Sequence, residues 1–184
     1  MISSILQATQ LEAEGVRVER HEVSLKDFLD DLRSNYAIPF GKELSLVWDY
    51  PSDLPVINTD GEKLKHVLQN LINNAIKFTE RGTVTISARY LNGASAEEAD
   101  IHHPEGNSQN GLLQFKVTDT GVGIAEDNFS TIFERFRQVD SSETRIHSGV
   151  GIGLYIVKGY TELLGGKVTV ESEPDKGSTF TVSL

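Results

Sequence analysis

The sequence contains no cysteine among its 184 residues, which excludes disulfide bonds, thiolate metal sites and a cysteine nucleophile. It has no signal peptide and no apolar run near the roughly 18 residues of a transmembrane helix, so we expect a soluble chain. Basic residues are few, because 17 Lys and Arg face 27 Asp and Glu, giving a formal net charge of −10. That charge argues against nucleic acid as a partner, although local N–H groups and a few cations can still hold phosphates.

Hydrophobic periodicity predicts one α+β domain in which helices cover one face of a single sheet. The clearest element is a helix opening at Asp60, whose apolar residues recur at helical spacing from Leu64 to Ile76. The expected strands are 16–23, 44–48, 83–90, 112–117, 167–171 and 178–184, and the other expected helices are 25–36, 129–136 and 149–164.

Residues 92–111 separate two of these strands with a stretch that holds only one large apolar residue, Ile101, and no Lys or Arg. Loops longer than about 12–15 residues are usually functional or disordered. We therefore expect a disordered insertion in a hairpin formed by the strands on either side.

Three polar residues, Asn70, Asn74 and Lys77, are spaced i, i+4 and i+7, so they share one face of the helix that opens at Asp60. Asparagine is a poor helix former, and two interpretations explain its presence. A solvated face tolerates it; alternatively, an amide oxygen coordinates a hard cation such as Mg²⁺ while the lysine meets a phosphate. The spacing alone leaves both interpretations open.

Two glycine-rich turns are the other candidate features. Residues 119–124 (DTGVGI) directly follow an expected strand, where glycine lets the backbone approach a flat ligand and Asp119 can accept a hydrogen bond from an amino group. Residues 149–154 (GVGIGL) open an expected helix, where exposed N–H groups and the helix dipole favour anions. Each turn alone is also compatible with an ordinary structural role.

Taken in order along the chain, five segments resemble the motifs of the GHKL ATPase superfamily and, within it, of the catalytic, ATP-binding domain of bacterial sensor histidine kinases. The resemblance implies a two-layer α/β sandwich of the Bergerat type, with a mixed sheet, helices on one face and a flexible ATP lid. The matching segments are NLINNAIKFT at 70–79 (N box), DTGVGI at 119–124 (G1 box), IFERF at 132–136 (F box), GVGIGL at 149–154 (G2 box) and KGSTF at 176–180 (closing motif).

The resemblance also implies a role in binding ATP and Mg²⁺ for each matching residue. Asn74 would ligate Mg²⁺, with Asn70 and Lys77 near the phosphates. Asp119 would accept from the adenine amino group, and Thr179 would support that contact. Residues implied to line the base are Gly121, Gly123 and Ile124, and those implied to hold phosphates at the second turn are Gly149, Gly151, Gly153 and Leu154.

Residues 125–148 would form the ATP lid, pinned by Phe133 and Phe136. Many members of the family have an arginine where this chain has Gln138. The cation that reaches the γ-phosphate is therefore left open among three arginines of this region, Arg135, Arg137 and Arg145.

The functional hypothesis is a histidine kinase domain that transfers the ATP γ-phosphate to a histidine on a separate dimerisation domain. Residues 1–15 would be the tail of an upstream dimerisation helix, and residues 16–184 the catalytic domain. None of the five histidines has phosphoacceptor surroundings, so we expect no autophosphorylation by this chain alone. The implied partners are a phosphoacceptor domain and, through its phosphohistidine, a response regulator receiver, and the implied location is the cytoplasm.

Two alternatives stay open. An ATPase of the gyrase, Hsp90 or MutL type needs a general base, and the gyrase-type pattern has glutamate four residues before the Mg²⁺ ligand. Here that position is Asn70, whose amide cannot take a proton at neutral pH, and this favours the kinase. A degenerate kinase would bind nucleotide without transferring phosphate, and the intact N, G1 and G2 motifs argue only against lost binding.

Overall fold

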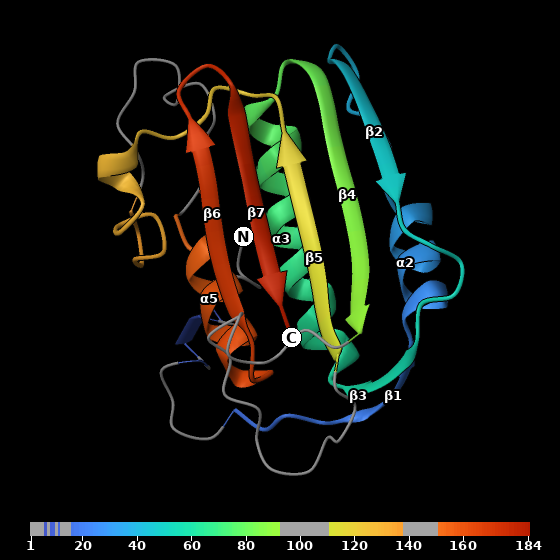
Figure 1. The fold of residues 1–184 in the computed structure, drawn as a ribbon. Coiled ribbons are helices and arrows are strands. Elements are labelled where there is room, and N and C mark those ends of the chain that lie inside the picture. The colour runs from blue at the N-terminus through green and yellow to red at the C-terminus, as the bar shows by residue number, and fades with distance from the viewer. Residues whose placement is uncertain (1–5, 7, 10, 12–15, 93–110, 138–150) are drawn as a thin grey trace.

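The computed structural model describes residues 6, 8, 9, 11, 16–92, 111–137 and 151–184, and these form two layers (Figure 1). A five-stranded sheet has the order β2-β4-β5-β7-β6, and the helices lie together on one of its faces. The elements are β1 (His21–Ser24), α2 (Leu25–Ser34), β2 (Glu43–Asp49), β3 (Val56–Thr59), α3 (Gly61–Phe78), β4 (Arg81–Asn92), β5 (Gly111–Asp119), the 3-10 turn η1 (Glu126–Asn128), α5 (Gly153–Leu163), β6 (Lys167–Glu173) and β7 (Gly177–Ser183).

The sheet is mixed, because β2 pairs in parallel with β4 whereas the β4–β5, β5–β7 and β6–β7 pairs are antiparallel. The expected α+β two-layer fold is confirmed. Within the part of the chain that the structure describes, no helix combines the length and apolar character needed to cross a bilayer.

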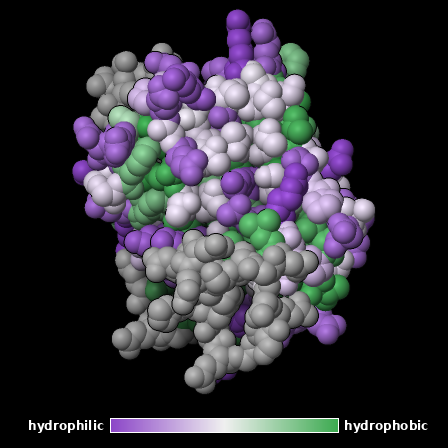
Figure 2. Space-filling model, viewed as in Figure 1, coloured by the Kyte–Doolittle hydropathy of each residue, from purple (hydrophilic) through white to green (hydrophobic). Residues whose placement is uncertain are grey.

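The core lies between α3 and the sheet and follows the two periodicities of the sequence. The expected apolar stripe of α3 is buried, and on β4 every second residue, Val84, Ile86 and Ala88, is buried against it. The residues that alternate with them, including Thr83, Thr85 and Ser87, face the other way, and the visible part of that open face is mostly intermediate to hydrophilic, with scattered hydrophobic residues (Figure 2). The strands therefore pack on helices through one face only.

The N-terminus of α3 is fixed by a buried carboxylate. The Asp60 side chain, at 3% residue exposure, accepts hydrogen bonds from the N–H groups of Lys63 (3.0 Å) and Glu19 (2.9 Å), and its Oδ2 lies 2.6 Å from the Lys63 ammonium. Asp60 thus caps α3 and ties it to the segment that precedes β1.

Two sequence predictions need correction, and one strand was not predicted. The first strand is shorter than 16–23 and holds only Val23 of the three valines, and β3, which pairs with it, was not predicted at all. Residues 129–136 form turns after η1 and no helix; at their end Phe136 adopts φ 60°, and its N–H donates to the carbonyl of Gly151 at 2.9 Å. The pairing of Asn92 with Gly111 confirms the hairpin around the insertion, whose residues 93–110 lie outside the described part.

Replacing the Asp60 cap should destabilise the fold in a pH-dependent manner. Burial raises the pKa of Asp60, but the hydrogen bonds from Lys63 and from the Glu19 backbone outweigh it, so the net pKa lies below its usual range. A carboxyl with a lowered folded pKa stabilises above its unfolded pKa of about 4, and this stabilisation is lost as pH falls through the folded value. We expect Asp60→Ala to lower the free energy of unfolding by about 2 kcal/mol at pH 7.

Urea denaturation between pH 3 and pH 7 measures the effect. Asp60→Asn, which keeps an acceptor but cannot ionise, should lose less stability at pH 7 and should show a flatter acid limb. Asp53→Ala, at an exposed turn position, is the matched control and should behave as the parent chain does. Equal effects of the Asp60 and Asp53 substitutions would contradict the proposed cap.

Candidate functional site

The C-terminal half of α3 meets the first residue of α5, and this contact gathers the predicted phosphate-side residues. Asn70 donates through Nδ2 to the carbonyl of His66 at 2.8 Å, which leaves its Oδ1 as an acceptor. A β-carbon at Gly153 would lie 3.1 Å from that Oδ1 and 3.8 Å from Nδ2 of Asn74. Asn70, Asn74 and Gly153 are therefore brought together. The Asn74 amide has no hydrogen-bond partner among the described residues.

Lys77 lies in the last turn of α3 and is half-buried. Burial lowers the pKa of its ammonium, which lies 4.7 Å from the centroid of the Phe78 ring. No carboxylate of the described segments pairs with it. An ammonium that is partly desolvated and has no anionic partner is suited to receive a phosphate.

Asp119 ends β5 with its side chain on the helix-facing side of the sheet, at 6% residue exposure. Its Oδ1 accepts a hydrogen bond from the N–H of Gly121 at 2.8 Å. Burial raises the pKa of Asp119, and backbone N–H groups of Gly121 and Ser178 offset only part of that rise. Within the described segments no Lys or Arg neutralises this carboxylate. The described residues therefore offer this carboxylate only neutral N–H donors, and a carboxylate can accept further hydrogen bonds from a ligand.

The structure places Thr179 away from Asp119, against the expectation from the sequence. Its Oγ1 lies 3.0 Å from that of Thr118, and neighbouring residues of a strand face opposite sides, so both hydroxyls lie on the open face. Ser178 is the register partner of Asp119 on the helix-facing side, is 6% exposed, and has its Oγ 2.9 Å from that of Ser172. Ser178 is the site residue that the sequence reasoning missed.

The glycines of the first turn are required by contacts of the chain with itself. A β-carbon at Gly121 would lie 2.3 Å from the carbonyl oxygen of Phe78, and one at Gly123 would lie 2.0 Å from that of Glu173. Ile124 is half-buried next to this turn, and its N–H donates to Ser172 Oγ at 2.8 Å. The glycines let the turn sit directly on the end of α3 and on the β6–β7 hairpin.

The second turn is described only from Gly151 onward, and Gly149 lies outside the described residues. At Gly151, which has φ 69°, a β-carbon would lie 2.7 Å from the carbonyl oxygen of Arg137. The next two residues lead into α5, whose N-cap, Ile152, makes no side-chain cap hydrogen bond. Because the first N–H groups of a helix lack intrahelical acceptors, the N-terminus of α5, with Gly153 and Leu154, offers donors to an anion.

The two lid phenylalanines behave differently. Phe133 packs edge-on against Phe180, with ring centroids 6.4 Å apart, and its role in pinning the lid stays a prediction. Phe136 is 57% exposed and lies under the Arg135 guanidinium at 4.7 Å, so the expectation that it pins the lid is wrong. Arg137 is exposed, with its Nε 3.9 Å from a carboxylate oxygen of Glu134. Arg145 lies outside the described residues.

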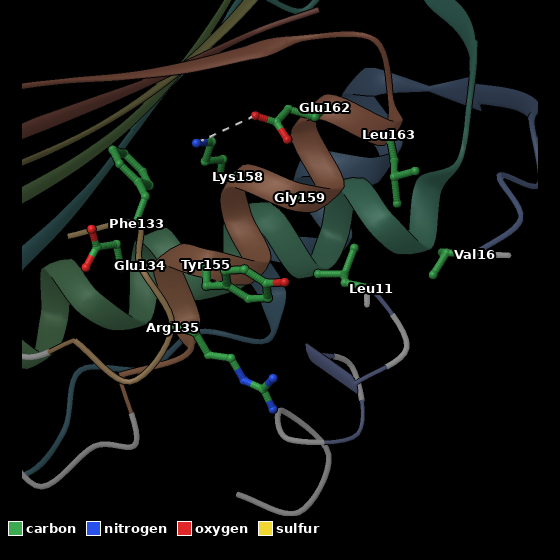
Figure 3. Close-up of a pocket in the computed structure, with 10 residues that line it drawn as sticks. All are labelled: Leu11, Val16, Phe133, Glu134, Arg135, Tyr155, Lys158, Gly159, Glu162 and Leu163. Carbon is green, nitrogen blue, oxygen red and sulfur yellow. Dashed lines mark ion pairs between the residues drawn. The ribbon is translucent and has the colours of Figure 1, made fainter. Parts of the chain in front are cut away.

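A separate cavity of about 820 Å³ lies on the outer side of α5, and Figure 3 shows the residues around it. Leu11 of the N-terminal helical segment occupies this side, where a β-carbon at Gly159 would lie 3.0 Å from its Cδ1. Of the predicted site residues, only Phe133 and Arg135 line this cavity. It is therefore distinct from the cluster around Asp119 and Asn74.

Comparison with known proteins agrees with this arrangement. Residues 59–184 match the model of the family described as histidine kinase-, DNA gyrase B- and HSP90-like ATPases. The chain belongs to this family. The matched residues include the whole of α3, both glycine turns and the closing strand, so the GHKL resemblance is confirmed.

The similar proteins include sensor histidine kinases. The chain is 33% identical over 187 residues to the autoinducer 2 sensor kinase/phosphatase LuxQ of Vibrio vulnificus, and 34% identical over 188 residues to the aerobic respiration control sensor protein ArcB of Escherichia coli. It is also 32% identical over 193 residues to histidine kinase 5 of Arabidopsis thaliana. Each match covers 100% of this chain but only 20–22% of the relative, so the chain spans about a fifth of their length.

Solved structures agree with the fold. Full-length ShkA in complex with AMPPNP superposes with a TM-score of 0.78 at 29% identity, covering 99% of this chain and 34% of ShkA. The Acinetobacter baumannii histidine kinase AdeS gives a TM-score of 0.68 at 21% identity, covering 100% of this chain and 75% of AdeS.

Substitution of Gly123 should separate two costs of a side chain in the first turn. Gly123 has φ 67° and its β-carbon would clash with the Glu173 carbonyl, whereas Gly41 has φ 90° and no atom within 4 Å of its β-carbon position. Gly41→Ala should therefore cost only the left-handed strain, about 1 kcal/mol. Gly123→Ala should lower the free energy of unfolding by about 1–3 kcal/mol more than Gly41→Ala does. Chemical denaturation of both variants measures the difference, and equal losses would contradict the close approach.

Proposed function

We propose that this chain is the ATP-binding catalytic domain of a two-component sensor histidine kinase, which transfers the γ-phosphate of Mg-ATP to a histidine on a separate dimerisation domain. The observation that carries the proposal is Asp119, a buried carboxylate with no cationic partner in the described part of the chain. An exocyclic amino group such as that of adenine would supply a further neutral donor to this carboxylate. Ser178, beside it on β7, takes the supporting place first assigned to Thr179.

The phosphate end of the proposed site lies between two helix termini. The N–H groups of Gly153 and Leu154 at the uncapped start of α5 favour anions, Gly151 would lie just before them, and Lys77 supplies a cation from the last turn of α3. Gly149 would extend the same turn. The match to ShkA covers 99% of the present chain. ShkA has been solved with AMPPNP, an ATP analogue, and this supports nucleotide binding here.

The residues present fit a magnesium ion that arrives with the nucleotide. Mg²⁺ takes few protein ligands and prefers oxygen donors, and the Asn74 amide is half-buried without a partner among the described residues. Asn74 would hold the ion through its amide oxygen, and the side chain of Asn70 would lie beside Asn74, near the phosphates. When bound, Mg²⁺ neutralises charge that develops on the transferred phosphoryl group. The γ-phosphate cation would come from Arg135, Arg137 or Arg145.

Transfer is favoured over hydrolysis by the chemistry of Asn70. Hydrolysis requires a general base near the attacking water, and an amide does not accept a proton at neutral pH. Its Nδ2 is also committed to the His66 carbonyl, so its free atom is a weakly basic oxygen. The domain would therefore position ATP and rely on an external histidine as nucleophile.

The same proposal assigns the remaining parts. Residues 1–15 would be the end of an upstream dimerisation helix, consistent with the helical conformation of Leu6, Ala8, Thr9 and Leu11. The phosphohistidine formed on the dimerisation domain would be the donor to a response regulator receiver. In this proposal the domain would lie in the cytoplasm, with no contact of its own to membrane or nucleic acid.

Binding should depend on Asp119 more strongly than on any exposed aspartate. Asp119→Asn replaces an accepting oxygen by a donor, so affinity for adenosine and for Mg-ADP should each fall at least about tenfold. Because burial raises the pKa of Asp119, affinity of the parent chain should start to fall at a higher pH than an ordinary carboxyl would give.

Calorimetric titration at several pH values between 4.5 and 8 is the measurement. Asp49→Asn, on the open face of the sheet and 55% exposed at its side chain, is the matched control and should leave binding unchanged. A parent chain whose melting temperature does not rise in millimolar Mg-ADP would overturn the proposal outright.

Phosphoryl transfer should occur in trans. Incubated with radiolabelled ATP and Mg²⁺, the chain alone should carry no acid-labile phosphohistidine, whereas a separately supplied helical phosphoacceptor domain should become labelled. Asn74→Ala should reduce that labelling at least about tenfold, since it removes the proposed metal ligand.

The two alternatives predict other outcomes in the same assay. Rapid steady hydrolysis without any acceptor would favour an ATPase of the gyrase type. Tight nucleotide binding with neither hydrolysis nor labelling of any supplied acceptor would favour a degenerate kinase that only senses nucleotide.

A further inference from the structure

Lys42, in the segment between α2 and β2, lies against the C-terminal end of α3. Its ammonium donates to three carbonyl oxygens, those of Ile76 at 2.7 Å, Lys77 at 3.0 Å and Thr79 at 3.0 Å. It also pairs with Glu80 Oε1 at 3.0 Å, and only 15% of its side chain is exposed. Three N–H donors thus meet three backbone acceptors, which is the full donor capacity of an ammonium.

These carbonyls need an outside donor because of how α3 ends. The last carbonyls of a helix have no intrahelical partner, and many helices satisfy them with a left-handed glycine after the last turn. Here Thr79 is extended, with φ −112° and ψ 112°, and the chain passes directly into β4. Lys42 replaces the missing cap. Glu80 is 62% exposed at its side chain, so its ion pair contributes little.

The end that Lys42 holds is the end that carries Asn74 and Lys77. Asp119, in contrast, is held by its own strand and by the Gly121 N–H, and its turn meets α3 at the carbonyl of Phe78, which Lys42 does not contact. We infer that Lys42 is a positioning residue that fixes the phosphate side of the nucleotide site and acts much less on the adenine side. The inference rests on the proposed function of that site.

Two ligands separate the two sides. Adenosine reaches only the proposed Asp119 end, whereas Mg-ADP also reaches Asn74 and Lys77. Lys42→Met keeps most of the side-chain volume but removes every donor. We expect it to weaken Mg-ADP binding about tenfold or more, because a displaced positioning group costs roughly 10–100-fold, while adenosine binding changes less than about twofold.

The matched control is Lys26→Met, which removes the same charge from an exposed ion pair with Asp30 on α2. It should leave both affinities unchanged. Lys42→Arg, which keeps N–H donors, should retain a ratio of the two affinities near that of the parent chain. Lys42→Ala, which also removes every donor, provides the comparison should Lys42→Met fail to fold.

Chemical rescue distinguishes positioning from general loss of structure. Lys42→Ala removes three methylenes and the ammonium, so propylammonium fits the space and restores the donors. Added propylammonium should recover Mg-ADP affinity in a saturable manner, and tetramethylammonium, with equal charge and no N–H group, should not.

The outcomes are distinct. If Lys42→Met leaves the ratio of the adenosine and Mg-ADP affinities unchanged, the positioning role is overturned. In that case Mg-ADP binding by the parent chain still sustains the proposed function. Absence of Mg-ADP binding by the parent chain would overturn both.

Discussion

The carbonyl oxygen of Phe78 and the turn after β5 approach so closely that no side chain fits between them: a β-carbon at Gly121 would lie 2.3 Å from that oxygen. The N–H of Val122 points at the same carbonyl, at 3.4 Å. This contact fixes the end of the longest helix against the end of a central strand. Asp119 and Lys77, which are 42 positions apart in the sequence, thereby become neighbours of one junction, and the rest of the candidate site is arranged around it.

Both charged groups at this junction are in surroundings that disfavour their charge. Burial raises the pKa of Asp119 and lowers that of Lys77, so in each case desolvation acts against the ionised form. Elsewhere the chain compensates such a cost, as at Asp60 with its ammonium and two N–H donors. At Asp119 and Lys77, no charged group of the described residues compensates the cost of desolvation. Groups left in this condition are more typical of binding sites than of structural ion pairs, because a ligand supplies the missing partners.

The sequence was sufficient where a single element determines the result. The apolar stripe of α3 and its opening at Asp60 depend on spacing within one segment, and both were predicted. The errors arose where partners are distant. Strand β3 has four residues and exists through pairing with β1, and Phe136 lies outside the helical region, where its N–H bonds to Gly151. Ser178 and Thr179 occupy opposite faces of β7. Ser178 alternates with Phe180 and Val182, which are buried, and this alternation would have indicated that Ser178 faces the helices.

The two helix ends beside the proposed phosphates have opposite polarity, and this explains why one is neutralised and the other is not. The N-terminus of α5 carries partial positive charge, which attracts an anion, and its N-cap makes no side-chain bond. The C-terminus of α3 carries partial negative charge, which would repel the same anion. Lys42 covers three of its carbonyls, and Lys77 adds a second cation in the same turn. An anion therefore meets a favourable potential from both helices, although only one of them presents its favourable end.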